Sequence, residues 1–381
     1  MVNPSHPRGA PALSTQITSP EEQLSWLRIT LVPGVSPGVQ RALLERYSQP
    51  SLVLAAHRSE LASLVGPEVA ERLAVGPEPV LLERALTWLS QPARFLLVRG
   101  GTGYPNALLT MSDPPVVLYA MGRVELLNQK AIAVVGSRNA TPQGIRDAHA
   151  FSTALSNAGY CIVSGLALGI DAAAHRGGLE GEGSSIAVVG TGADIVYPRR
   201  NLDLAHRIAE FGCVVSEFPL GTRPLAGNFP RRNRLISGLS RGVLVVEAAR
   251  DSGSLITARF ALEQGRDIFA IPGSIHSPFS KGCHDLIKEG AKLVECAADV
   301  LDEIACTWGE SRMPAPPLQP SPLPPHPLLD LMGFAPISVD QIAQRTGLAA
   351  GFLASQLSRF EIEGHVSLLP GGWFQRVDRI E

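Results

Sequence analysis

AIAVVG (131–136), CIVSG (161–165), SIAVVG (185–190), CVVSE (213–217), GVLVVE (242–247) and DIFAIPG (267–273) are six short apolar runs that decide the fold. Segments with helical periodicity, such as 143–158, 202–211 and 255–264, lie between them. Apolar runs of this length are typical of strands buried on both faces, and strands that alternate with helices at this spacing indicate parallel pairing. The sequence therefore predicts an α/β fold with an extended Rossmann-like, doubly wound parallel sheet.

The segments on the N-terminal side predict a leader and a separate helical module. Residues 1–20 contain no periodic pattern and are expected to be a disordered leader. Residues 21–90 predict a helical module similar to a SAM or helix–hairpin–helix module, because apolar residues recur at helical spacing between Gly-Pro turns. A helix–hairpin–helix turn at 31–47 would aim backbone N–H groups at a phosphate. A plain helical bundle is the alternative, which the balanced charge of this region favours.

The segments on the C-terminal side of the core, which spans 95–308, predict a linker and a second small domain. Eight prolines fall within 311–327, so residues 309–327 are expected to form an extended linker. Residues 328–381 have the helix–turn–helix–strand–strand pattern of a winged helix. Residues 309–381 hold five basic against seven acidic residues, and a helix that reads DNA needs positive charge. The pattern therefore favours a protein-contact module over a DNA reader.

The overall charge limits the kinds of partner that the chain can bind. The 33 basic and 35 acidic residues give a formal net charge of −2, which excludes a histone-like polycation. A nucleic-acid site must therefore be a local patch. Only Lys130, Lys281, Lys288 and Lys292 are lysines, so such a patch must be made of guanidinium groups.

Other motifs are absent from the sequence. The five cysteines are scattered and form no C-x-x-C pair, which argues against a disulfide framework and a structural zinc site. Neither a signal peptide nor an apolar run long enough for a membrane span is visible, so we expect a soluble, cytoplasmic protein. The patterns G-x-G-x-x-G and G-x-x-x-x-G-K-[ST] are also missing. We therefore expect neither a cofactor nor a metal.

Small polar residues gather where the predicted strands end. They are Gly136, Ser137 and Arg138 after the first strand, Ser164 and Gly165 after the second, Gly190-Thr191-Gly192 after the third, and Ser252, Gly253 and Ser254 beyond Glu247. Glycine lets a backbone approach a phosphate closely, and the helix that follows supplies N–H donors. Several such loops on one rim suit a polymer of phosphates better than a single nucleotide.

The segment 223–241 (RPLAGNFPRRNRLISGLSR) holds five arginines and no acidic residue. Arg231, Arg232 and Arg234 cluster at the start of a predicted helix beside Phe229 and Asn233. Arginine binds phosphate through two hydrogen bonds, and an aromatic ring can stack on an unpaired base. The alternative is a solvated arginine face. If the segment binds DNA, alanine at 231 and 234 should weaken single-strand binding and leave the fold intact, because both are expected at the surface.

Two groups of residues suggest catalysis instead. Glu247, at the end of a buried strand, could act as general acid or base in a hydrolase of nucleoside monophosphates. His175 could pair with Asp171 four residues earlier on one helix face. The structural alternative is that Asp171 caps the helix and His175 packs beside that cap.

Taken together, these stretches resemble the DNA-processing protein A family, DprA or Smf. The resemblance rests on VGSR (135–138), SGLALGIDAAAH (164–175), TGADIVYPRRN (191–201), FPRRNRLISGLS (229–240) and VVEAARDSGSLITARFALEQGR (245–266). It is dense over residues 95–305, and the helical and winged-helix flanks match more loosely. The run of motifs in order is far more specific than any single motif.

The resemblance implies a non-enzymatic protein that binds and shields single-stranded DNA entering by natural transformation. It implies loading of the RecA recombinase and a homodimer formed through the Rossmann-like domain. The family's strand-binding pocket corresponds to Arg138, Phe229, Arg231 and Arg234, with Ser164, Gly165, Asn233 and 252–254 on the same rim. The alternative is a Rossmann-like hydrolase of the lysine-decarboxylase-like type that would use Glu247. Its P-G-G-x-G-T-x-x-E motif is missing here.

Overall fold

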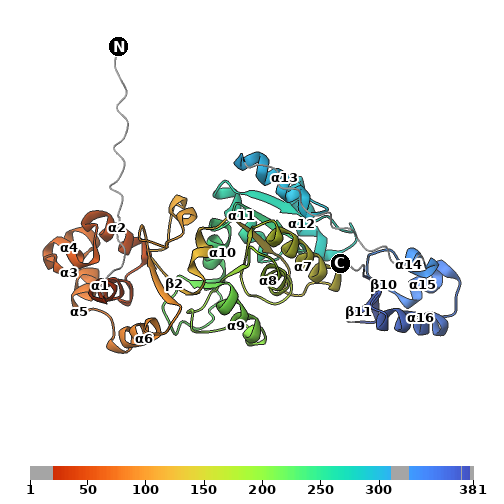
Figure 1. Ribbon diagram of the computed structural model, residues 1–381, viewed down its shortest axis with the longest axis horizontal. Helices are drawn as coiled ribbons and strands as arrows, with labels where there is room; N and C mark the ends of the chain where they lie inside the picture. The colour runs from red at the N-terminus through yellow and green to blue at the C-terminus, as the bar shows by residue number, and fades with distance from the viewer. Residues whose placement is uncertain (1–19, 310–325, 370, 378–381) are drawn as a thin grey trace, which may run out of the picture. The chain divides into compact units, whose positions relative to one another are not determined.

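The computed structural model describes residues 20–309, 326–369 and 371–377 (Figure 1). The expected leader and most of the expected proline-rich linker lie outside the described residues. The chain divides into two compact units, one formed by residues up to Asn128 with Thr191–Ile195 and Val215–Arg223, the other by the remainder. No helix in the described part is long and apolar enough to cross a membrane. The predicted domain limits stay predictions.

Six helices open the first unit, and five of them begin with proline. Proline costs no hydrogen bond at the first helical position, and its fixed φ suits the helix. The helices are α1 (Pro20–Thr30), α2 (Pro37–Tyr47), α3 (Pro50–Ala55), α4 (Arg58–Val65), α5 (Pro67–Val75) and α6 (Pro79–Leu89). At the position of the possible helix–hairpin–helix turn, Ser36 caps α2 by accepting a hydrogen bond from the Val39 N–H at 3.4 Å. One free N–H of that helix is therefore already satisfied by the chain.

A β-hairpin completes the first unit. Strand β1 (Arg94–Val98) pairs antiparallel with β2 (Val117–Gly122), and two 3₁₀ turns, η1 (Asn106–Thr110) and η2 (Val124–Asn128), flank β2. One face of the hairpin packs on the helices, where the rings of Trp88 and Tyr119 meet edge to face with centroids 6.2 Å apart. Burial raises the pKa of the Tyr119 hydroxyl. The hairpin and helices therefore share one hydrophobic core.

The second unit contains the predicted parallel sheet. Its strands lie in the order β5-β4-β3-β7-β8-β9. They are β3 (Ala131–Val135), β4 (Cys161–Ser164), β5 (Ser185–Val188), β7 (Gly242–Val245), β8 (Asp267–Ala270) and β9 (Lys292–Leu293), while β6 (Cys213–Ser216) is divided between the units. The strand order reverses at β3, because β4 pairs with one side of β3 and β7 with the other. In such sheets ligands bind beyond the carboxyl ends of the strands at this reversal.

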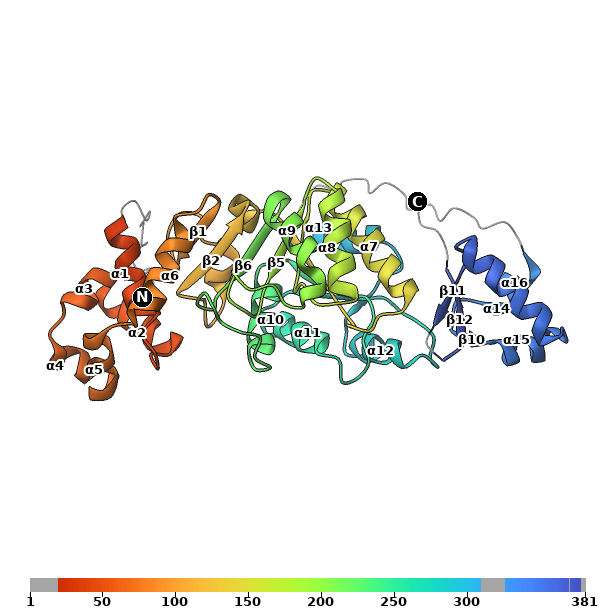
Figure 2. The ribbon, with the colours of Figure 1, turned by 90° about the horizontal axis from the view of Figure 1, so that it is seen from below.

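Helices cover both faces of the parallel sheet (Figure 2). They are α7 (Pro142–Asn157), α8 (Ile170–Glu180), α9 (Leu202–Phe211), α10 (Asn228–Gly238), α11 (Ser254–Glu263), α12 (Lys281–Lys288) and α13 (Ala297–Trp308). Helices α7, α8 and α13 contribute Phe151, Ala173 and Ile304 to a buried cluster with Ile132 and Leu244 of the strands. This cluster forms a hydrophobic core on one face of the sheet, and α10 and α11 lie on the other face (Figure 2).

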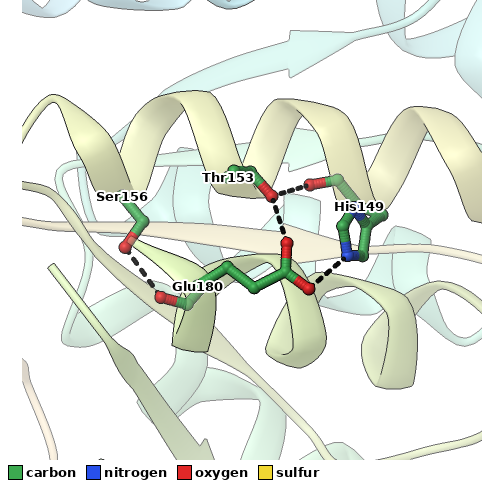
Figure 3. Close-up of polar contacts among 5 residues, drawn as sticks. His149, Thr153, Ser156 and Glu180 are labelled. Carbon is green, nitrogen blue, oxygen red and sulfur yellow. Dashed lines mark hydrogen bonds and ion pairs between the residues drawn. The ribbon is translucent and has the colours of Figure 1, made fainter. Parts of the chain in front are cut away.

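Polar contacts hold α7 against α8 (Figure 3). His149 Nε2 lies 3.0 Å from Glu180 Oε1, and the Ser156 hydroxyl donates to the Gly178 carbonyl at 2.7 Å. The helices approach so closely that a Cβ on Gly177 would lie 2.3 Å from the His149 carbonyl oxygen. Glycine is therefore required there for packing, and these contacts fix the C-terminal part of α8 against α7.

The C-terminal part forms a winged helix. It contains α14 (Pro327–Met332), α15 (Val339–Thr346) and α16 (Ala350–Ile362), with a three-stranded antiparallel sheet in the order β10-β12-β11. The strands are β10 (Ile337–Ser338), β11 (Val366–Leu369) and β12 (Trp373–Arg376). A capping box at Ser338 starts α15, and Leu353 and Leu357 of α16 are fully buried. The predicted winged helix is confirmed.

Candidate functional site

A pocket of about 790 Å³ opens beyond the carboxyl ends of β3, β4 and β7. It lies at the carboxyl ends of the strands, where the sequence predicts a ligand site, and the structure shows that the strand order reverses there. Predicted site residues that line it are Gly136, Ser137, Arg138, Phe229, Arg232, Asn233, Ser252, Gly253 and Ser254. Ser164, Gly165, Arg231 and Arg234 do not line it. The fold therefore brings most of the predicted residues to one cavity.

Hydrogen bonds from the backbone of Ser137 to neighbouring segments hold the loop after β3 in place. The Ser137 N–H donates to the Glu247 carbonyl at 2.7 Å, and its hydroxyl accepts from the Asn139 N–H at 3.1 Å. The Ser137 carbonyl accepts from the Ile170 N–H at the start of α8. The polar groups of Ser137 therefore shape the loop. The exposed Arg138 guanidinium is the charged group that the loop offers to a ligand.

Phe229 lies between a guanidinium and a second aromatic ring. The Arg138 Cζ atom is 5.6 Å from the Phe229 ring centroid, within the range of a cation–π contact. The Tyr197 ring lies 5.7 Å from Phe229 at an angle of 38° and is 46% exposed. All three side chains line the pocket. Flat rings beside a cation are a surface on which an unpaired base can stack.

Tyr197 was not predicted from the sequence, although it belongs to this aromatic group. In the sequence, Gly190-Thr191-Gly192 stands out as a loop after a strand, whereas residues 193–201 stand out only through the family resemblance. A usable signal was present: an aromatic residue next to proline, followed by Arg199 and Arg200, in the connection after a buried strand. Asn139, Asp251 and Phe279 also line the pocket without having been predicted.

Arg232 is buried rather than presented to a ligand. Only 4% of it is exposed, and Nη1 donates to the Gly165 carbonyl at 2.6 Å and to the Val188 carbonyl. A Cβ on Gly165 would lie 2.7 Å from the guanidinium, so glycine is needed for this approach. Burial lowers the pKa of Arg232 to about 10, while the nearby Asp171 carboxylate opposes the shift. Arg232 therefore connects the ends of β4 and β5 to α10.

Arg234 also differs from the expectation, since it is only 6% exposed. Its place in the first turns of α10 turns it inward with Leu235 and Ile236, both of which are buried. Arg231 is half-buried. Surface positions were expected for Arg231 and Arg234. The expectation was wrong for Arg234, because which face of a helix is covered depends on what packs against it. Alanine at these two positions would test the fold together with binding.

The other predicted polar residues mostly make structural bonds. The Ser164 hydroxyl is fully buried and donates to the Val134 carbonyl at 2.7 Å. Asn233 Nδ2 donates to the Gly253 carbonyl at 3.3 Å, which ties α10 to the loop before α11. The hydroxyls of Ser252 and Ser254 lie 2.7 Å apart at the start of α11. These contacts position the rim, with Ser252–Ser254 facing the pocket.

Asp171 and His175 act separately on the loop 164–169. Asp171 Oδ2 accepts from the N–H groups of Gly165 and Ala167 at 3.1 and 3.2 Å. His175 Nε2 accepts from the Leu166 N–H, and Nδ1 lies 2.7 Å from the Ser185 hydroxyl, which itself donates to the chain. Burial raises the pKa of Asp171. Both side chains therefore have structural contacts. The expected cap is wrong in detail, because Asp171 binds the loop before α8, and the N-cap of α8 is Gly169 with no side-chain hydrogen bond.

Glu247 holds the start of α7. Its Oε1 accepts from the Thr141 hydroxyl at 2.6 Å and its Oε2 from the Thr141 N–H at 2.9 Å. Thr141 in turn caps α7 by accepting from the Gly144 N–H. Burial raises the pKa of Glu247. Both carboxylate oxygens are thus used inside the chain, and Glu247 does not line the pocket. No cluster of three metal-ligating side chains occurs in residues 20–309, 326–369 and 371–377.

The buried His175 should make the folded chain less stable in acid. Burial lowers its pKa to about 3, from 6.5 when exposed, with smaller effects from Arg232 and Arg176. Between these values the unfolded chain binds the extra proton, so the free energy of unfolding falls by up to about 1.4 kcal/mol per pH unit as pH decreases. Asp171, with its raised pKa, opposes this fall over part of the range.

Urea unfolding from about pH 7 to pH 5 measures this contribution in wild type and His175→Gln. Glutamine keeps an acceptor for the Leu166 N–H but does not titrate. We expect the variant to lose less stability than wild type over the same range. Equal pH dependence in both proteins would contradict a neutral, buried His175.

Comparison with known proteins identifies two regions of the chain. Residues 95–305 match the family model described as DNA recombination-mediator protein A, and residues 312–372 match the DprA winged helix domain. Protein Smf of Escherichia coli K12 is 44% identical over 299 residues, which cover 77% of this chain and 80% of that protein. DNA processing protein DprA of Streptococcus pneumoniae is 50% identical over 200 residues, covering 52% of this chain and 71% of that protein.

Two solved structures are similar over most of their lengths. The X-ray structure of DNA processing protein A from Streptococcus pneumoniae has a TM-score of 0.66 and 38% identity, and covers 76% of this chain and 99% of that one. DNA processing protein A from Helicobacter pylori has a TM-score of 0.51 and 29% identity, covering 57% and 96%. The structure of the Helicobacter pylori protein gives insight into its unique single-stranded DNA binding mode.

Proposed function

Because the chain belongs to the DNA recombination-mediator protein A family, we propose that it binds single-stranded DNA in the pocket beyond β3, β4 and β7. The observation that carries this proposal is the Phe229 ring, which lies between the Arg138 guanidinium and the Tyr197 ring. An unpaired base stacks on such rings, while a guanidinium neutralises the neighbouring phosphate. The bases of a duplex are already stacked and paired, so they do not reach these rings.

The predicted site residues divide into two roles in this proposal. Those that line the pocket, apart from the buried Arg232, contact DNA: Gly136, Ser137, Arg138, Phe229, Asn233, Ser252, Gly253 and Ser254. Ser164, Gly165 and Arg232 hold the loops in place through buried hydrogen bonds. Arg231 and Arg234 stay candidates for contact with phosphate at the edge of α10. Because residue 253 is glycine, the N-terminus of α11 can approach the phosphates of the bound DNA closely.

Membership of the family supports a proposal for the cellular role. We propose that the protein takes part in DNA processing during natural transformation, where it shields an incoming single strand and loads the RecA recombinase onto it. A homodimer formed through the Rossmann-like domain would offer two pockets to one strand and so raise the apparent affinity. These steps take place in the cytoplasm.

We propose that the protein acts by binding alone, without catalysis, cofactor or metal. The competing hypothesis, a nucleoside-monophosphate hydrolase, needs Glu247 as acid or base. Thr141 donates to both of its carboxylate oxygens, and Glu247 serves to start α7. Phosphate or base release from nucleotides would restore the hydrolase hypothesis.

The winged helix is proposed to contact protein rather than DNA. Its three described arginines all bond within the domain: Arg359 to Glu363, Arg376 to Asp330, and Arg345 to the Leu331 carbonyl. Paired arginines have less charge to offer to phosphates. Exposed apolar side chains, including Phe352 and Ile362 on α16, suit a protein partner instead.

The test of the proposed function is a binding titration with single- and double-stranded DNA of matched length. At moderate salt, single strands should bind at least about tenfold more tightly, because stacking contributes about 1–3 kcal/mol per base. Fluorescence anisotropy over a series of salt concentrations separates this stacking from phosphate contacts. Equal affinity for duplex and single strand would contradict binding through Phe229.

A further inference from the structure

We propose that Arg199 and Arg200 form a second contact for the single strand, where it leaves the pocket past Tyr197. The inference rests on the proposed function, and it adds a path for the polymer beyond the pocket. Tyr197 lines the pocket and stacks near Phe229. The two arginines follow after one proline, in the 3₁₀ turn η3 (Arg199–Asn201). Consecutive Cα atoms are about 3.8 Å apart, so Arg199 lies within about 8 Å of Tyr197 along the chain.

The two guanidinium groups are exposed and not neutralised. Within residues 20–309, 326–369 and 371–377, neither makes a side-chain hydrogen bond or ion pair. Some other surface arginines are paired, such as Arg250 with Asp285 at 3.0 Å and Arg123 with Glu125 at 3.0 Å, while others, such as Arg207, are single and unpaired among the described residues. Two adjacent unpaired arginines on a neutral protein create a local positive potential that attracts phosphate.

The position of the pair at the start of α9 adds to this potential. Helix α9 begins at Leu202, directly after Arg200 and Asn201. The first turn of a helix carries a partial positive charge, where acidic residues are favoured and basic ones are not. Asp203 offsets part of the charge, but it forms no ion pair with either arginine among the described residues. A phosphate at this position would relieve the repulsion that the free protein carries.

The turn that bears the two arginines is fixed to the rim of the pocket. Asn201 is 3% exposed, and its Nδ2 donates to the carbonyls of Leu166 and Ala167 at 2.9 and 3.0 Å. That loop is itself held by Asp171 and His175. The backbone that carries the two arginines is therefore fixed before DNA binds, so the turn itself loses little conformational entropy when the arginines contact phosphates.

The experiment compares oligothymidylates of about 4 and about 20 nucleotides, a range that spans pocket-sized and extended single-strand sites. Arg199→Ala/Arg200→Ala in the full chain should bind the short strand like wild type. It should bind the long strand about tenfold more weakly, as expected for lost charge-assisted contacts. Its salt slope on the long strand should be lower by about 1.4, at about 0.7 per phosphate. Arg199→Lys/Arg200→Lys should retain most of the slope, because it keeps both charges.

A matched control removes two positive charges elsewhere. Arg58→Ala/Arg359→Ala breaks surface ion pairs with Glu71 and Glu363 and should leave both strands and the slope unchanged. If the Arg199/Arg200 variant binds the long strand like wild type, while a variant lacking Arg138 and Phe229 loses binding, this inference is overturned and the pocket stands. If wild-type protein binds neither oligothymidylate, the proposed function fails as well.

Discussion

Replacing Arg138 and Phe229 together by alanine should weaken single-strand binding by about 3 kcal/mol or more, roughly a hundredfold in Kd. Base stacking contributes about 1–3 kcal/mol, and a charge-assisted hydrogen bond about 1.5–3 kcal/mol. Arg138 lies over the Phe229 ring, so both contributions disappear with the double substitution. Anisotropy titration with a labelled single strand at fixed salt measures the loss.

Two single variants show whether the ring itself is responsible. Phe229→Tyr keeps the aromatic surface and should restore most of the affinity in the presence of Arg138. Phe229→Leu fills similar space beside Gly190 without a flat ring, and should not restore it. If the Kd of the double variant stays within about twofold of wild type, a difference of only about 0.4 kcal/mol, Arg138 and Phe229 do not form the binding site.

Arg232→Ala should lower the free energy of unfolding by about 3–5 kcal/mol, the usual cost of removing one member of a buried charged group. The change leaves the Gly165 and Val188 carbonyls without a donor. It also removes a positive charge beside the buried carboxylate of Asp171. In the wild-type protein that charge lowers the pKa of Asp171. Urea unfolding of the full chain, followed by far-ultraviolet circular dichroism, measures the loss.

The neighbouring arginine supplies a matched control for this loss. Arg231→Ala, one residue earlier in α10 and half-buried, should cost about 1 kcal/mol or less. In an Asp171→Asn background the cost of Arg232→Ala should shrink, because no buried charge is then left unpaired. An Arg232→Ala protein that unfolds like wild type but has lost DNA binding would instead make Arg232 a contact residue.

The sheet could be predicted from the sequence because its strands are buried on both faces. A run such as AIAVVG at 131–136 has no polar position that could face water, and its first five residues form β3, with every one of them buried. The site on the rim was predictable for a related reason, since parallel strands end at one edge of the sheet. The small polar residues that follow β3 and β7 therefore reach one pocket.

The roles of single arginines could not be predicted in the same way. Arg231, Arg232 and Arg234 share one short segment, yet only Arg232 reaches the carbonyls of Gly165 and Val188. This contact depends on Gly165, which lies 67 positions earlier in the chain and leaves room for the Arg232 guanidinium. Tyr197 was missed because its partner Phe229 is brought beside it only by the fold.

The pocket lining contains arginines but no lysine, as far as the chain is described. The only four lysines of the chain lie at 130, 281, 288 and 292, and the last two are more than half exposed and form ion pairs on the surface. Amine-reactive dyes will therefore label the protein at Lys288 and Lys292, which are not part of the pocket lining. Amine-directed cross-linkers will for the same reason fail to capture DNA bound there, and a light-activated base in the oligonucleotide is the better choice.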